Sequence, residues 1–107
     1  MTEPDRLDAE RTIRELRAAG RLAEAVRLIG RLGPYGRADG PDATTSLGAA
    51  VLEEYGDQLA GTDPDAADAA YRDAAADQGA FAGGATSGGE GLARIAEADR
   101  IEAKRRR

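Results

Sequence analysis

The chain has 107 residues, with no cysteine and no histidine, and its 20 acidic and 15 basic side chains give a formal net charge of −5. This length indicates one domain. The absence of cysteine excludes a disulfide framework and thiolate chemistry, and the absence of histidine excludes an imidazole base and an ordinary zinc site. We therefore expect neither a cofactor nor a bound metal.

The charge is unevenly distributed along the chain. Residues 1–40 carry eight arginines and seven acids, residues 41–100 carry three arginines and twelve acids, and residues 101–107 carry four cations and one acid. A nucleic-acid binder must neutralise phosphates with a basic surface. The acidic middle of the chain would repel phosphates instead, so we do not expect nucleic acid as a partner.

No segment has the character of a membrane span or a signal peptide. No apolar run approaches the roughly 18 residues that a membrane-spanning helix needs. The N-terminal residues are polar and acidic and lack the apolar region of a signal peptide. We expect a cytoplasmic protein without membrane association. The abundance of Ala, Arg, Gly and Asp resembles that of proteins from GC-rich bacterial genomes.

Alanine takes the place of larger apolar residues in this sequence. There are 24 alanines, whereas Leu, Ile, Val and Phe together number only 16. Alanine favours helices and lets them approach closely, but it buries little apolar area. We expect an all-α domain of four to five helices with a thin core. Such a core predicts a marginally stable monomer, or a fold that self-association or a partner completes.

The first predicted hairpin covers residues 5–32. Its first helix begins near Pro4, which suits the first helical turn, and ends at about Ala19, before Gly20. A second helix is predicted from about Leu22 to Leu32. Its apolar residues follow the helical spacing closely: Leu22, Ala25, Val26, Ile29 and Leu32. Residues 33–43 are rich in Gly, Pro and Asp, which predicts a loop.

The second predicted hairpin covers residues 44–82. Thr44 or Ser46 caps its first helix, which continues to about Leu59. Asp63 and Pro64 form a strong start signal for the next helix. We expect one side of this helix to be buried, namely Ala67, Ala70, Tyr71 and Ala74, with Gln78 and Phe81 continuing it. The opposite side holds Asp65, Asp68, Arg72, Asp73 and Asp77.

The C-terminal part is predicted to hold a glycine-rich connector and one more helix. The connector covers residues 83–89 and the helix about residues 90–106, with a basic end that suits a helix C-terminus. Its apolar residues are Leu92, Ile95, Ala96 and Ile101. No run of alternating β-branched residues occurs, so no strand is expected.

Both hairpins have residues at the spacing of tetratricopeptide repeats. The matching residues are Gly20, Ala25, Ile29 and Leu32 in the first hairpin and Ala67, Tyr71 and Ala74 in the second. Residues 6–76 therefore resemble this family, whose repeats pair two antiparallel helices in about 34 residues. The sequence departs from the family at Thr12 and Ile13, and Ala25 and Ala67 are 42 residues apart. The alternative is an unrelated small helical bundle.

The resemblance implies a peptide-binding groove lined by the first helix of each hairpin. Arg11, Arg14 and Arg17 recur every three residues on the first helix and would face that groove. Arginine suits this role because its planar fork binds carboxylates bidentately. One alternative is a solvated face paired with Glu10 and Glu15. Another is that the arginine-rich first hairpin docks against the acidic fourth helix of a second copy, with Arg21, Arg27 and Arg31 contributing as well.

Tyr55 is the fourth residue that we select as a candidate for partner binding. A tyrosine at an interface combines a large apolar ring with a polar tip. The alternative is that Tyr55 packs between the helices of the second hairpin. The partner predicted for these four residues is another protein or an acidic peptide segment, with self-association left open.

The remaining motifs do not indicate catalysis. The carboxylates are dispersed over helix surfaces, and neither a helical di-metal site nor a calcium loop is present. The segment GGATSGGEGLAR lacks the lysine and the preceding strand of a phosphate-binding loop. We therefore expect a small non-catalytic adaptor. The alternatives are a structural or accessory subunit of an enzyme complex, or a homodimeric helical bundle with a small-molecule pocket.

Overall fold

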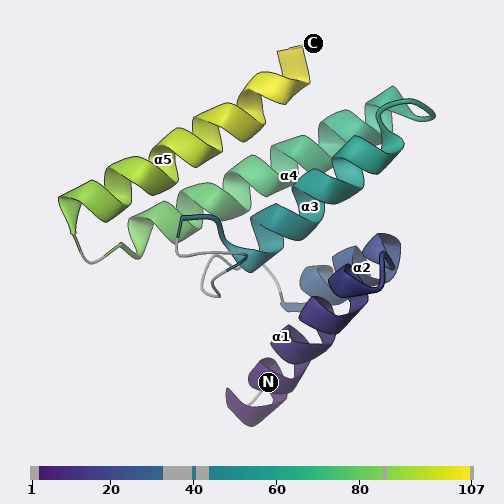
Figure 1. Cartoon of the computed structure of the whole chain (residues 1–107), viewed down its shortest axis with the longest axis horizontal. Coiled ribbons are helices and arrows are strands. Elements are labelled where there is room, and N and C mark those ends of the chain that lie inside the picture. The colour runs from purple at the N-terminus through teal and green to yellow at the C-terminus, as the bar shows by residue number, and fades with distance from the viewer. Residues whose placement is uncertain (1–2, 33–39, 41–43, 86, 107) are drawn as a thin grey trace.

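The computed structural model describes residues 3–32, 40, 44–85 and 87–106 (Figure 1). These residues form five α-helices, one short 3-10 helix and no strand, which confirms the all-α prediction. The elements are α1 (Glu3–Ala18), α2 (Leu22–Leu32), α3 (Leu47–Leu59), α4 (Pro64–Gly83), α5 (Gly88–Ala103) and the 3-10 helix η1 (Lys104–Arg106). The loop predicted at residues 33–43 lies outside the described residues apart from Gly40.

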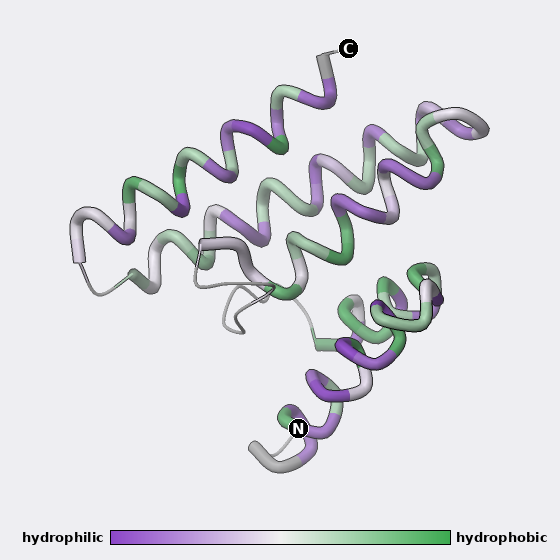
Figure 2. The backbone as a smooth tube through the Cα atoms, in the orientation of Figure 1, coloured by the Kyte–Doolittle hydropathy of each residue, from purple (hydrophilic) through white to green (hydrophobic). Residues whose placement is uncertain are grey.

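Each helix packs against the next one in the chain, from α1 to α5. In Figure 1 the helices cross the picture along roughly one diagonal, in the spatial order α5, α4, α3 and then the α1–α2 hairpin. Helix α5 and the first hairpin therefore lie at opposite edges of the array. Figure 2 shows hydrophobic residues interspersed with hydrophilic ones along all the helices. This distribution agrees with the thin core that the alanine content predicts.

Gly20 makes the first hairpin possible. Its φ of +75° is a left-handed conformation that a glycine adopts without steric cost. The backbone N–H groups of Gly20 and Arg21 donate to the carbonyls of Arg17 and Leu16 at 3.0 and 2.9 Å. This is the Schellman pattern of a helix end. The chain then reverses, and Ile13 of α1 and Ile29 of α2 share a core cluster with residues of α3.

The second hairpin is set by two caps and by close approach of its helices. Ser46 and Asp63 accept hydrogen bonds from the backbone N–H groups of the third residue after each, at 3.0 and 3.1 Å. Gly56 of α3 lies against the ring of Tyr71 from α4. A Cβ atom at this position would come within 2.6 Å of that ring, so the missing side chain lets α4 lie close to α3.

The structure differs from the sequence predictions at two places in the second half. The predicted connector at 83–89 is shorter, because α4 continues to Gly83 and Ser87 caps α5 by accepting from the Glu90 N–H at 3.1 Å. Asp77, which we expected on the solvent side of its helix, is buried. The reason is tertiary, since Gly48 of α3 leaves room for the Asp77 carboxyl.

Candidate functional site

The structure places the predicted arginines on α1 in different environments. Arg11 is exposed and pairs with Asp8 of its own helix at 3.2 Å. Arg14 is exposed as well. Arg17 instead reaches α3, where its Nε lies 2.5 Å from Glu54 Oε2. Arg17 thus helps to join the first hairpin to the second, and binding a partner would require breaking that pair.

Tyr55 is half-buried on α3, next in sequence to the partner of Arg17. The tyrosine that packs closely between α3 and α4 is Tyr71, which is buried against Gly56. A binding role for Tyr55 and for the three arginines remains a prediction.

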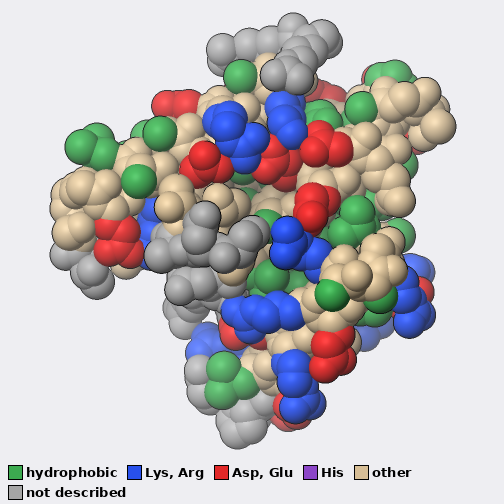
Figure 3. Space-filling view, in the orientation of Figure 1, with side chains coloured by type: hydrophobic (Ala, Val, Ile, Leu, Met, Phe, Trp, Pro, Cys, Tyr) green, Lys and Arg blue, Asp and Glu red, His purple; other side chains and the backbone are tan. Residues whose placement is uncertain are grey.

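A row of charged side chains connects α3 to the C-terminal end of α5. Figure 3 shows acidic and basic side chains alternating between these elements. Arg100 binds the Glu53 carboxylate with two nitrogens, at 2.6 and 2.8 Å. Lys104 lies 2.7 Å from Glu53 and 2.9 Å from Asp57. These pairs hold α5 to α3 along the side where both helices rest on α4.

The ion pairs change the acidity of their members. Burial alone would raise the pKa of Glu53, but hydrogen bonds from Arg100 and Lys104 outweigh it and leave that pKa lowered. Burial would lower the pKa of Lys104, whereas its bonds with Glu53 and Asp57 leave the pKa raised. Both groups therefore stay charged over a wider pH range than in a free peptide.

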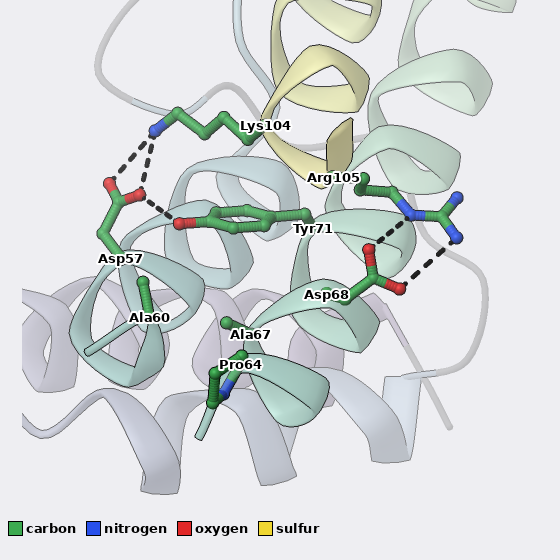
Figure 4. Close-up of a pocket in the computed structure, with 8 residues that line it drawn as sticks. All are labelled: Asp57, Ala60, Pro64, Ala67, Asp68, Tyr71, Lys104 and Arg105. Carbon is green, nitrogen blue, oxygen red and sulfur yellow. Dashed lines mark hydrogen bonds and ion pairs between the residues drawn. The ribbon is translucent and has the colours of Figure 1, made fainter. Parts of the chain in front are cut away.

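A cavity of about 390 Å³ adjoins this row (Figure 4). Figure 4 shows Tyr71 at its centre, with the Asp57–Lys104 pair on one side and the Asp68–Arg105 pair on the other. The Tyr71 hydroxyl donates to Asp57 at 2.6 Å, and Arg105 binds Asp68 at 3.0 Å. The remaining lining residues are Ala60, Pro64 and Ala67.

The polar groups of this cavity are directed at one another. Lys104 balances Asp57 and also lies 5.5 Å from the centre of the Tyr71 ring, within cation–π range. A ligand that used the charged groups of this cavity would have to compete with their existing ion pairs. Lys104 and Arg105 belong to η1, so these pairs anchor η1 to α3 and α4.

A second polar cluster is buried where α3 begins. The Ser46 hydroxyl donates to Asp77 at 2.7 Å, and the Ser46 N–H donates to the Gln78 side chain at 2.9 Å. Gln78 in turn donates to the backbone carbonyl of Arg94 at 3.0 Å. Burial raises the pKa of Asp77 to about 6, although the Ser46 hydroxyl and the Ala49 N–H favour the charged form.

Arg94 completes this cluster from α5. Its guanidinium lies 3.7 Å from the centre of the Phe81 ring and donates to the Phe81 carbonyl at 2.9 Å. It also pairs with Glu90 one helical turn earlier. Ser46 is fully buried, so its hydroxyl cannot meet a substrate. The cluster fixes the mutual positions of α3, α4 and α5.

An open groove of about 350 Å³ lies on the first hairpin. Leu16 of α1 and Leu28 of α2, both half-buried, provide its apolar part. Its charged residues are Glu24, Arg27 and Arg31 of α2. Glu24 is held by Arg21 at 2.7 Å. Arg27 and Arg31, one turn apart and exposed, have no hydrogen bond or ion pair within the part of the chain that the structure describes.

The sequence predictions selected Arg11, Arg14, Arg17 and Tyr55 as the binding site, and they included Arg27 and Arg31 only in the alternative of docking against a second copy. The sequence does indicate that acids are scarce on α2, because Glu24 is the one acid within a helical turn of Arg27 in that helix. Whether that acid pairs with Arg27 or with Arg21 depends on side-chain geometry, which the sequence does not give. The outcome leaves two guanidinium groups available beside two leucines.

In comparisons with known proteins, no family model, no curated protein and no solved structure matches this chain. None of the helices among the described residues combines the length and the apolar character needed to cross a membrane. The site must therefore be interpreted from its own geometry.

Proposed function

We propose that this protein is a small, non-catalytic interaction module that binds an acidic segment of a partner protein in the α1–α2 groove. The observation that carries the proposal is a pair of guanidinium groups, Arg27 and Arg31, that have no partner among the described residues and lie beside half-buried Leu16 and Leu28. Such a groove suits a segment with one aliphatic side chain flanked by carboxylates, because arginine binds carboxylates in a planar, two-bond geometry.

The state of the other polar clusters supports a non-catalytic role. In the cavity, Asp57 accepts from the Tyr71 hydroxyl and pairs with Lys104. In the second cluster, the Ser46 hydroxyl is buried together with Asp77, to which it donates. A general acid or base has to reach a substrate proton within hydrogen-bond distance. The resemblance to tetratricopeptide repeats favours the same class of function, and a cytoplasmic location would suit it.

The groove predicts weak, salt-sensitive binding. It accommodates only a few side chains, and exposed ion pairs contribute about 0.2–1 kcal/mol each. At physiological ionic strength such charges are screened beyond about 8 Å. We expect micromolar or weaker affinity, as is usual for transient contacts with small interfaces.

Fluorescence anisotropy with a defined peptide tests the proposal. The probe is a fluorescein-labelled peptide in which one leucine lies between two glutamates, and the protein is kept dilute. We expect Arg27→Ser/Arg31→Ser to weaken binding by about two- to thirtyfold, because it removes two ion pairs of about 0.2–1 kcal/mol each and about 1.4 kcal/mol corresponds to tenfold.

The matched control is Arg72→Ser, which removes an exposed arginine that already pairs with neighbouring Asp73 and lies outside every candidate site. It should change the affinity less than twofold. Equal affinity of the groove variant and the wild type, with helix content unchanged by circular dichroism, would refute the proposed binding site.

A further inference from the structure

The outer face of α5 carries two apolar side chains that the fold leaves in solvent. Leu92 is 71% exposed and Ile95 is 49% exposed. Asp99 is exposed on the same side of the helix, because positions 92, 95 and 99 follow the three- and four-residue spacing of one helix face. Asp99 forms no hydrogen bond or ion pair with any residue that the structure describes.

This face follows an uncharged segment and belongs to a helix whose inner side is buried. Residues 78–89, which precede it, contain no charged side chain. Figure 3 shows hydrophobic and neutral groups covering most of this end of the molecule, at the left of the view. Ile101 and Arg94 anchor the inner side of α5 in the interior. The exposed leucine and isoleucine are therefore presented by a fixed helix.

The unsatisfied groups of α5 match those of the α1–α2 groove. The groove offers Leu16 and Leu28 with two cations, and the face of α5 offers two aliphatic side chains with one acid. None of these three charged groups has a partner in the ranges that the structure describes. One carboxylate can accept from two cations, as Glu53 does from Arg100 and Lys104 in this structure. Burial of exposed Leu92 and Ile95 would add the apolar contribution that favours association.

We propose that the α5 face of a second copy of this chain docks in the α1–α2 groove, so that copies associate head to tail. The inference rests on the proposed function, because it names the partner of that same groove. The two surfaces lie at opposite edges of the array (Figure 1), so they cannot meet within one molecule. Each added copy then presents a free groove at one end and a free α5 face at the other.

Such a contact is heterologous, since two different surfaces meet. Heterologous contacts produce open chains or closed rings, in contrast to a symmetric dimer, which ends at two copies. The docking surfaces are small compared with stable interfaces, which bury about 1,200–2,000 Å² in total. We therefore expect association only at high protein concentration, and weaker association at high salt, where the Asp99 pairs are screened.

Sedimentation equilibrium of the full chain tests the proposal through two blocked variants. Arg27→Ser/Arg31→Ser removes the charges of the groove, and Leu92→Asn/Ile95→Asn removes the apolar side chains of the α5 face. We expect the average mass of the wild type to rise above the 11.1 kDa of the monomer as concentration increases. Each blocked variant alone should remain monomeric.

The decisive sample is an equal mixture of the two variants. One variant retains an intact α5 face and the other an intact groove, so the mixture should form pairs and nothing larger. The control Leu7→Asn makes the same type of substitution at an exposed leucine of α1 and should associate like the wild type. Circular dichroism of each variant verifies that its helices are formed.

Three results would overturn the inference. The first is a wild type that stays monomeric up to about 2 mM, a concentration above a dissociation constant of about 1 mM. The second is a groove variant that associates by itself, which would indicate a symmetric contact. The third is a mixture that stays monomeric although the wild type associates. If the acidic peptide still binds the groove in any of these cases, the proposed function stands and only the identity of the partner is wrong.

Discussion

Asp77 provides the most direct test of how the interior is built. Its carboxyl is 9% exposed, and burial raises its pKa from 3.8 to about 6 in the folded chain. The folded protein therefore binds the Asp77 proton more tightly than the unfolded chain does. Stability must fall as the pH rises from about 4 to 6 and then level off. A gap of about two pKa units corresponds to about 3 kcal/mol at 1.36 kcal/mol per unit.

The substitution Asp77→Asn removes this titration and nearly preserves the shape of the side chain. Its amide oxygen can still accept from the Ser46 hydroxyl, which donates to Asp77 at 2.7 Å. We expect the unfolding free energy of the variant, relative to the wild type, to grow by about 2–3 kcal/mol between pH 4 and pH 7. Urea unfolding of both proteins at several pH values measures this difference.

The unfolding free energy of the wild type is subtracted from that of the variant because other carboxyls also make stability depend on pH. The pKa of Glu53 is lowered, so its contribution to stability increases with pH and opposes that of Asp77. Both proteins share this contribution, and it cancels in the difference. Asp73→Asn makes the same substitution at an exposed position of the same helix and serves as the control for the exchange of carboxylate for amide. A constant difference for Asp77→Asn, or one that shrinks as the pH rises, would refute the placement of this carboxyl.

Further predictions concern the contacts of α3 and α4. Glu53→Gln should reduce the unfolding free energy at pH 7 by about 1 kcal/mol, the upper end for partly exposed ion pairs, because it weakens the bonds to Arg100. That loss should diminish in urea titrations as the pH falls through the lowered pKa of Glu53, where the wild type loses the same charge. Gly56→Ala should destabilise the fold by about 1–3 kcal/mol, since the new methyl group meets the Tyr71 ring. Gly79→Ala, which meets nothing within 4 Å, should raise the melting temperature instead, by removing about 0.5–1 kcal/mol of glycine cost in a helix.

The sequence predicts the helices well where their signals are local. The bounds of α2 agree with the predicted Leu22–Leu32, because its apolar spacing is regular and Gly20 ends the helix before it. The start of α4 at Pro64 follows from its cap and its first-turn proline. Such features involve residues within about one helical turn of each other, so they are visible without any knowledge of packing.

The sequence predicts less where an outcome depends on distant neighbours. Asp77 has the spacing of a solvated face, and only the gap beside Gly48 on another helix explains its burial. Leu92 and Ile95 have the apolar character of core residues, yet α5 turns Ile101 inward and leaves them exposed. Arg27 and Arg31 were left out of the predicted binding site for a similar reason, since their availability depends on whether Glu24 pairs with Arg21 or with Arg27.

The position of Lys104 has a practical consequence for studying the motion of this chain. It is the single lysine in the sequence, and it lies between Glu53 and Asp57, where its raised pKa disfavours the neutral amine. An amine-directed acylating reagent reacts only with the unprotonated form. Its rate of reaction at this nitrogen would therefore report how often the C-terminal helix detaches from its neighbours, which makes one natural side chain a built-in chemical probe of local unfolding.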